Sequence, residues 1–312
     1  MKNYFGFNLT GQKLLPVWIL FMLCFFAPYV TLVLKMQYYQ PGEKPSLVFF
    51  PLLLVLIIVA FIVSFYIVKM TIENVVYKEK TLVFNGSLGK YTGKVLLGLF
   101  LSIITFGIYM PWFIRDIHGY YIDSSSYDSN FFKFKAKAGK LFVILLLTIF
   151  VPMIILVVLM MIFFGYGAAK IPAAVLMQQV VMLFIMVPYM YLVYKWMINI
   201  DYKEFNISWD TEFWSACGKI ALEMILTVIT IGIYMPMAML RLYQYFTERT
   251  VATSPDRKLS FGYDIDQLND FLFIWGQTLL VIVTLGIYYP WSFCKICKRI
   301  LNKTYILDQS SV

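Results

Sequence analysis

Long apolar runs decide the class of this 312-residue chain. Four of them reach about 20 residues, the length of helix that crosses about 30 Å of hydrocarbon. Apolar residues make up 61% of the chain and charged residues only 14%, against about 25% charged in ordinary soluble domains. We therefore expect an integral membrane protein and exclude a nucleic-acid-binding domain and a soluble enzyme. The four predicted spanning helices are Leu14–Leu34, Leu47–Val68, Leu141–Phe164 and Pro172–Tyr194.

Three further apolar runs carry the same interruption near their ends, a T-x-G-I-Y-x-P motif. Glycine costs about 1 kcal/mol inside a helix, and proline lacks a donor and clashes with the preceding turn. The motif therefore predicts a helix with a built-in break in Val95–Ile114, Ile220–Leu240 and Phe271–Phe293. The candidate functional residues at these breaks are Thr105, Gly107, Tyr109, Pro111, Trp112, Thr230, Gly232, Tyr234, Pro236, Thr284, Gly286, Tyr288, Pro290 and Trp291.

The chain repeats itself at an offset of 125 to 127 residues. Such self-similarity predicts repeated structural units. We expect a first membrane repeat over 1–126, a second over 127–255, and a truncated third over 256–312 with a C-terminal amphipathic helix. The predicted fold class is an all-α polytopic membrane protein, in which a duplicated two-helix hairpin and a broken helix are joined by short strand pieces.

The strand pieces alternate aromatic with polar residues, as half-buried strands do. In FFKFKAKA the residues Lys133, Lys135 and Lys137 share one face of a predicted strand. Extended backbone cannot lie unpaired in lipid, so we expect these pieces outside the hydrocarbon, paired as a small sheet. The pieces are FGFNL, LVFNGS, FFKFKAKA, KEFNISW and LSFGYDI.

Two topologies compete. If all seven apolar runs cross the membrane, 12 lysine and arginine residues lie on one side of it and 14 on the other, which is no bias. If the three interrupted runs instead return to their own side, the loops Lys35–Ser46 and Gly165–Lys170 face out with three basic residues, and 23 of the 26 face in. The positive-inside rule favours the second topology, although three crossings per repeat would match a recurrent transporter architecture.

The formal charge of +9 favours contact with anionic lipid headgroups in a membrane protein. We expect membrane lipids as partners, no nucleic acid, and a multi-pass arrangement in the membrane with a cytoplasmic N-terminus. Lys2 and Lys13 precede a first run too long for a cleavable signal, so that run is expected to remain as an anchor.

Few residues are candidates for catalysis or for binding a ligand. His118 is the only histidine, and Glu223, four residues after Lys219, is the only acid inside an apolar run. An acid within a membrane segment is a functional candidate, although this one could also reach the interface beside Lys219. Arg115 and Arg241, just past the first two breaks, are candidate headgroup contacts. A single C-x-x-C pair and one histidine cannot close a zinc site, so we expect no metal, no cofactor and no enzymatic activity.

The repeated T-x-G-I-Y-x-P-W motif, with an F-x-G or F-x-F strand piece ahead of it, resembles the YjgN-like family of bacterial inner-membrane proteins. The resemblance runs over most of Phe84–Lys303, and Met237 departs from it by replacing the tryptophan. It implies location and fold more than activity.

Two functions remain open. Broken helices free backbone groups that could line a polar site near Gly107, Gly232 and Gly286, which favours a channel or carrier for a small molecule or lipid. The rival is a non-transporting scaffold or lipid-interacting factor with a cytoplasmic docking face.

Overall fold

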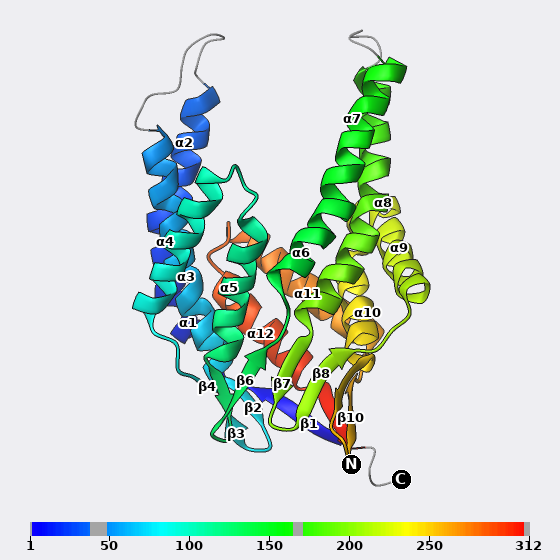
Figure 1. The fold of residues 1–312 in the computed structure, drawn as a ribbon. Helices are drawn as coiled ribbons and strands as arrows, with labels where there is room; N and C mark the ends of the chain where they lie inside the picture. Colours follow the sequence, from blue (N-terminus) through cyan, green and yellow to red (C-terminus); the bar gives the residue numbers. More distant parts are fainter. Residues whose placement is uncertain (1, 38–48, 165–170, 309–312) are drawn as a thin grey trace.

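The computed structural model describes residues 2–37, 49–164 and 171–308. Strands form the base of the molecule and helices rise from it (Figure 1). Most of the loop 35–46 and all of the loop 165–170, which the favoured topology places outside, lie beyond the described residues.

An antiparallel sheet of eleven strands ties the described residues together, in the order β3-β2-β1-β11-β10-β9-β8-β7-β6-β5-β4. The expectation of an all-α fold is therefore wrong. The strands are β1 (Lys2–Phe7), β2 (Val75–Tyr77), β3 (Lys80–Thr81), β4 (Val83–Phe84), β5 (Ser125–Tyr127), β6 (Asn130–Phe134), β7 (Asn199–Tyr202), β8 (Phe205–Trp209), β9 (Thr250–Thr253), β10 (Lys258–Tyr263) and β11 (Thr304–Asp308).

The sheet curls until its two edges come together. Only Leu82 separates the edge strands β3 and β4, and its N–H donates to the carbonyl of Val75. Tyr127 on β5 donates its hydroxyl to the carbonyl of Tyr77 on β2, at 2.9 Å, and Lys80 forms an ion pair with Asp128. Because the edges meet in this way, few backbone groups stay open for pairing with another chain.

Helices leave and rejoin this sheet in five places, each between two paired antiparallel strands. The first long pair, called the first arm, stands between β1 and β2, and the second arm stands between β6 and β7. The first arm consists of the continuous helix α1–η1–α2 (Gly11–Phe21, Met22–Phe26, Ala27–Gln37) and of α3 (Phe49–Glu73), and the second of α6–η2–α7 (Ala138–Leu145, Leu146–Phe150, Val151–Phe164) and of α8 (Ile171–Met197).

The three interrupted runs form short helical hairpins rather than single bent helices. The first, second and third short hairpins lie between β4 and β5, β8 and β9, and β10 and β11, respectively. The strands before and after each short hairpin are antiparallel and hydrogen-bonded to each other. Each short hairpin therefore leaves the sheet and rejoins it at the same end of these two strands. Their helices are α4 (Leu88–Ile104) and α5 (Met110–Asp123), α9 (Phe213–Ile229) and α10 (Met235–Glu248), and α11 (Gln267–Val283) and α12 (Tyr289–Leu301).

Three helices among the described residues are long and apolar enough to cross a membrane: Gly11–Leu34, Phe49–Glu73 and Ala138–Ile162. They coincide with three of the four expected spans. The fourth expected span falls in the 27-residue helix α8, and its crossing remains a prediction. The division into repeats also remains a prediction.

The alternation expected in FFKFKAKA is present, although β6 itself ends at Phe134. Phe134 and Ala136 are buried while Lys133, Lys135 and Lys137 are exposed. The indole of Trp196 on α8 packs edge-on against Phe134 and donates to the carbonyl of Lys137 at 2.9 Å. The second arm is therefore fixed to the sheet where β6 turns into α6.

Candidate functional site

The T-x-G-I-Y-x-P motif forms the same tight turn in each short hairpin. In the first, the Thr105 hydroxyl donates to the carbonyl of Leu101 at 2.7 Å and accepts the N–H of Tyr109 at 3.0 Å. The N–H of Gly107 returns to the carbonyl of Ser102 at 2.7 Å. These bonds satisfy backbone groups at both helix ends that would otherwise be costly in an apolar medium. Thr230 and Thr284 make the corresponding bonds in the other two hairpins.

Each turn holds a large apolar residue in the left-handed backbone region, directly before a glycine in the same region. The φ angles are +51° at Phe106, +52° at Ile231 and +49° at Leu285. This region costs an ordinary residue roughly 1 kcal/mol or more, and a β-branched residue is an outlier there. The three side chains are also 97%, 93% and 85% exposed, so no packing within the protein compensates for the strain.

The expected break is present in each run, and the prolines of the motif begin the helix that follows it. Pro111, Pro236 and Pro290 are each the second residue of α5, α10 and α12. Proline suits the first turn of a helix because its missing donor has no intrahelical partner there. All three rings are buried.

The aromatic residues of the motif pair along the second helix of each hairpin. Tyr109 stacks on Trp112, and Tyr288 stacks on Trp291, each pair with rings 16° from parallel. In the second hairpin, where Met237 replaces the tryptophan, the guanidinium of Arg241 lies 5.8 Å from the ring centre of Tyr234. In the third hairpin the ammonium of Lys295 likewise lies 5.4 Å from the ring centre of Tyr288, so a cation beside the tyrosine does not depend on the loss of the tryptophan.

Two expected residues, Glu223 on α9 and Tyr234 in the turn just before α10, meet inside the second short hairpin. Glu223 on α9 has no exposed surface. Its Oε2 atom accepts the hydroxyl of Tyr234 at 2.9 Å, and its Oε1 atom accepts the ammonium of Lys219 at 2.6 Å. A buried charge needs such partners, and the side chain of Lys219, which supplies one of them, is 29% exposed. That Lys219 and Glu223 reach the membrane interface together remains a prediction.

His118 and Arg115 lie on α5, away from Glu223. His118 stacks on Phe134 with ring centres 5.0 Å apart. Together with Tyr121 it also lines an open apolar groove of about 530 Å³ between α3 and α5. Arg115 points toward β6, donating to the carbonyl of Ala136 and pairing with Asp116 at 3.1 Å. The groove is lined by Phe61, Val68, Met110, Phe113, Ile114, Ile117, His118, Tyr121 and Ile122.

The expectation that Gly107, Gly232 and Gly286 line a polar site is wrong for the described part of the chain. A Cβ atom built on Gly107 or Gly232 meets nothing within 4 Å, and one on Gly286 meets only the end of Met22, at 3.9 Å. The backbone groups of the turns are bonded within the turns or to an indole N–H, as Trp18 donates to the carbonyl of Gly286 and Trp275 to that of Ile233.

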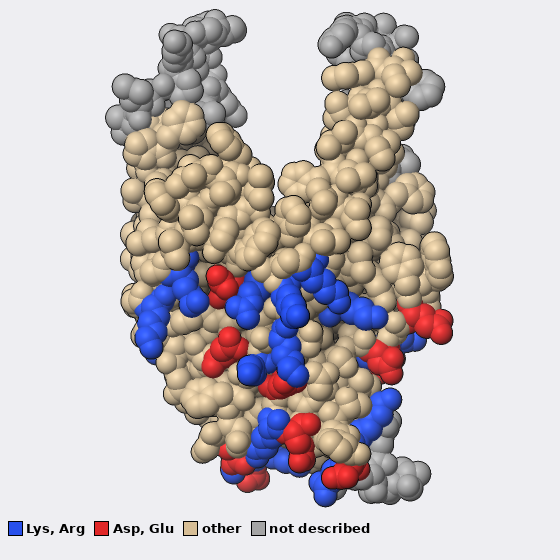
Figure 2. Space-filling view, viewed as in Figure 1, with Lys and Arg blue, Asp and Glu red and all other residues tan. Residues whose placement is uncertain are grey.

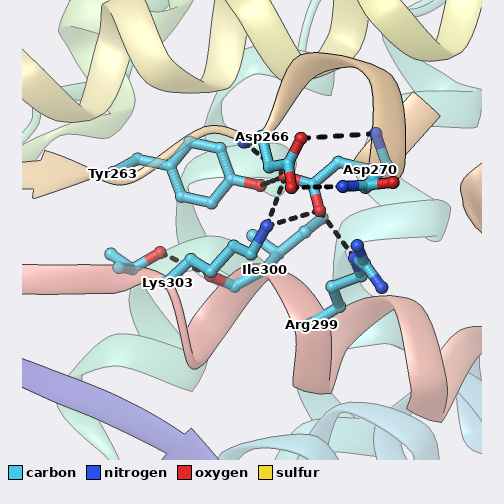
Figure 3. Close-up of polar contacts among 8 residues, drawn as sticks. Tyr263, Asp266, Asp270, Arg299, Ile300 and Lys303 are labelled. Carbon is cyan, nitrogen blue, oxygen red and sulfur yellow. Dashed lines mark hydrogen bonds and ion pairs between the residues drawn. The ribbon is translucent and has the colours of Figure 1, made fainter.

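Sequence reasoning missed a buried ionic cluster at the sheet end of the third short hairpin (Figure 3). Asp270 on α11 is 1% exposed. Its Oδ1 atom accepts from both Arg299 and Lys303 at 2.6 Å, and its Oδ2 atom accepts the N–H of Asp266 at 3.0 Å. Burial alone raises the pKa of Asp270, but the bonds from Lys303 and Arg299 outweigh it and hold that pKa below its usual value. The apolar run expected from the sequence begins one residue later, at Phe271, and therefore does not include Asp270.

Comparison with known proteins agrees with the membrane assignment. Inner membrane protein YjgN of Salmonella typhimurium is 37% identical over 71 residues, which are 23% of this chain and 18% of that relative. No solved structure matches the chain significantly. Together with the three apolar helices, this relative supports an inner-membrane protein.

The profile of a family described as bacterial protein of unknown function, DUF898, matches residues 2–261. The third short hairpin and β11 lie beyond the matched residues, although β11 joins β1 to β10 in the sheet. The resemblance to YjgN-like proteins is confirmed. The chain therefore belongs to the DUF898 family of bacterial proteins of unknown function.

Proposed function

We propose that this protein is a multi-pass, lipid-binding protein of the inner membrane, without enzymatic activity. The sheet lies in the cytoplasm, and the two arms span the membrane. The three short hairpins enter the inner leaflet and return to the cytoplasmic side. The observation that carries the proposal is the presence of Phe106, Ile231 and Leu285 at strained, almost fully exposed turn positions. In water, glycine or asparagine would serve better at such positions, whereas a tip in hydrocarbon favours a large apolar side chain.

The distribution of charge supports the same placement. Lysine and arginine gather in a belt below the apolar arms, and the arms themselves are free of charge in this view (Figure 2). A basic belt directly beneath an apolar zone suits the negative surface of a cytoplasmic leaflet. Of the 26 basic residues, 23 fall on the sheet side in this arrangement.

The groove between α3 and α5 is the proposed place for a lipid chain. Its walls are apolar, and its volume of about 530 Å³ is open to the surroundings of the helices. Three exposed lysines follow α5 in the chain: Lys133 on β6, Lys137 just before α6 and Lys140 on α6. Both β6 and α6 pack against α5. An acyl chain in the groove would leave an anionic headgroup close to these lysines.

Lipid binding can be tested in nanodiscs of mixed lipid. Changing Lys133, Lys137 and Lys140 to glutamine should lower the share of anionic lipid that remains bound in native mass spectrometry, since each lysine contributes about 1 kcal/mol near an anionic surface. A matched control changes Lys78 in the β2–β3 turn, Lys203 in the β7–β8 turn and Arg257 in the β9–β10 turn, all exposed, with the same loss of charge. Equal loss of anionic lipid in both variants would refute a specific site.

The groove itself is tested separately. Ile117→Trp places a larger side chain in the groove and should lower retention of any phospholipid, while Ile108→Trp at an exposed turn should not. Unchanged retention in the Ile117 variant, with normal folding, would remove the groove from the proposal.

A further inference from the structure

The same backbone hydrogen bond closes all three short hairpins at the end that meets the sheet. In each, the residue directly after the entering strand donates its N–H to the carbonyl of the residue directly before the leaving strand, at 2.8 or 2.9 Å. The side chains at these positions can therefore be compared from one hairpin to the next. The pairs are Asn85 with Ser124, Asp210 with Arg249, and Asp264 with Lys303.

In the third hairpin, the charged side chains around this bond are paired within the protein. Lys303 donates to both carboxylate oxygens of Asp270, and Asp264 pairs with Lys2 at 2.8 Å. The carboxylate of Asp266, at the N-cap of α11, accepts two hydrogen bonds from one asparagine of that helix. These charges therefore satisfy one another.

The equivalent charges of the second hairpin lack such partners. Ala216 lies 14 residues before the turn threonine, as Asp270 does, and is fully buried. Among the described residues, neither the guanidinium of Arg249 nor the carboxylate of Glu212 takes part in an ion pair or a hydrogen bond. The guanidinium is held instead over the ring of Tyr245, 3.7 Å from its centre. Arg249 and Glu212 are therefore available to a ligand.

These two side chains line an open pocket of about 370 Å³ at the start of α9, together with Asp210, Thr211 and Ser215. All five lining residues are at least partly exposed. The hydroxyls of Thr211 and Ser215 lie 3.2 and 3.4 Å from the hydroxyl of Tyr245. Three hydroxyls carry three protons, and these two bonds use two of them. One proton therefore remains to be donated to a ligand.

Charges of both signs in the pocket select the ligand. Asp210, which has Lys258 only at 3.8 Å, and Glu212 disfavour a simple anion, and Arg249 disfavours a simple cation. A ligand that carries a phosphate and an ammonium group, joined by two carbons, offers a charged hydrogen-bonding partner to each. The ammonium should be primary, because a carboxylate needs N–H donors that a quaternary amine lacks. This chemistry is that of phosphoethanolamine.

An exposed stripe on α9 connects the pocket with the hairpin turn. Its residues follow one another at intervals of three or four, which places them on one face of the helix. Trp214 begins the stripe beside the pocket, and tryptophan is enriched at the level of lipid headgroups. Acyl chains attached to a headgroup in the pocket can lie along this stripe, which soluble phosphoethanolamine cannot use. The stripe consists of Trp214, Gly218, Leu222, Ile225 and Ile229.

We propose that the pocket at the start of α9 binds the headgroup of an ethanolamine phospholipid, with the phosphate on Arg249 and the ammonium on Glu212. The inference rests on the proposed insertion of the short hairpins into the inner leaflet. It adds a zwitterionic lipid on the second hairpin to the anionic lipid proposed for the groove between α3 and α5.

Neutral variants test the two contacts separately. The protein is placed in nanodiscs of phosphatidylethanolamine, phosphatidylcholine and phosphatidylglycerol, and the lipid that stays bound is counted by native mass spectrometry. Arg249→Gln should lower the retention of both zwitterionic lipids about tenfold, because a hydrogen bond to a charged group is lost. Glu212→Gln should lower only phosphatidylethanolamine, to the level of phosphatidylcholine. Arg257→Gln and Glu204→Gln, in exposed sheet turns, are the matched controls and should behave as the unchanged protein.

A third variant uses the comparison between hairpins. Ala216→Asp gives Arg249 the partner that Lys303 has, and should lower retention of phosphatidylethanolamine as Arg249→Gln does. If this variant does not fold, the two exposed charge variants decide.

Three results would overturn the proposal. They are equal retention of phosphatidylethanolamine in Arg249→Gln, Glu212→Gln and the controls, no preference of the unchanged protein for phosphatidylethanolamine over phosphatidylcholine, and displacement of the lipid by an equal concentration of soluble phosphoethanolamine. Phosphatidylglycerol in the groove is counted on the same samples and should stay unchanged in all these variants. Failure of this site can therefore be distinguished from failure of lipid binding as a whole.

Discussion

Trp18 donates its indole N–H to the carbonyl oxygen of Gly286 across 3.0 Å. The same ring stacks on Tyr289 with centres 4.3 Å apart, and Trp291 packs so closely on Gly11 that a Cβ atom there would lie 2.6 Å from the indole. The first arm is therefore bound to the third short hairpin, which lies beyond the residues matched by the family profile.

Removing this donor should loosen the first arm. Trp18→Phe keeps the stacking but leaves the Gly286 carbonyl without the indole, and should lower the free energy of unfolding by about 1 kcal/mol. Trp275→Phe should act similarly, since Trp275 donates to the carbonyl of Ile233 at 2.9 Å. Thermal unfolding in detergent checks both, with the 83% exposed Trp214 changed to phenylalanine as the control. Equal melting temperatures for all three variants would show that the indole bonds add no stability.

Because of the Asp270 cluster, the stability of the protein should depend on pH in the acidic range. The pKa of Asp270 is lowered in the folded state, so its contribution is fully present above the unfolded value of about 3.9 and is lost as pH falls through the lower folded value. Asp270→Asn should cost about 3 kcal/mol at pH 7, because Arg299 and Lys303 lose their buried partner. The loss should shrink below pH 3.

Urea unfolding at pH 7 and pH 3 measures this difference, with Asp210→Asn as the exposed control. A pH-independent effect of Asp270→Asn would mean that Asp270 acts through shape rather than charge.

The turn between β2 and β3 is strained. Lys78 and Glu79 have φ angles of +45° and +65°, which suit the two-residue turn that prefers Asn-Gly. Replacing the two residues with Asn-Gly should raise the free energy of unfolding by about 1 kcal/mol. A loss of stability on this change would indicate that the two charges contribute more than the strain costs.

Much of the fold could be predicted, because apolar length and period-2 alternation are local signals. Phe134 and Lys133 lie on the faces that the alternation predicts, and the interrupted runs fold back to the sheet. The strands after the helices could not be predicted. Segments such as Ser125–Tyr127 are short, and they form strands because they pair with strands distant in sequence.

The candidate site was only partly predictable. Glu223 is conspicuous as an acid in an apolar run, but its bond to Tyr234 depends on the tight turn that folds α10 back on α9. The motif glycines were misjudged because a glycine with positive φ closes a turn as readily as it lines a site. Asp270 was missed because its cationic partners lie about 30 residues later, on α12 and just after it.

The depth of the hairpin turns in the membrane is the most direct test of whether the short hairpins enter the inner leaflet. Nitroxide labels are attached at positions 106, 231 and 285 in a variant with its four native cysteines changed to serine. The accessibility of each label to dissolved oxygen and to a water-soluble nickel complex is then measured in liposomes. If the short hairpins enter the inner leaflet, all three labels will be accessible to oxygen and protected from nickel, while a label at Glu79 in the sheet turn will show the reverse. Free access of nickel to the three hairpin labels would contradict insertion of the short hairpins and, with it, the proposed lipid-binding arrangement.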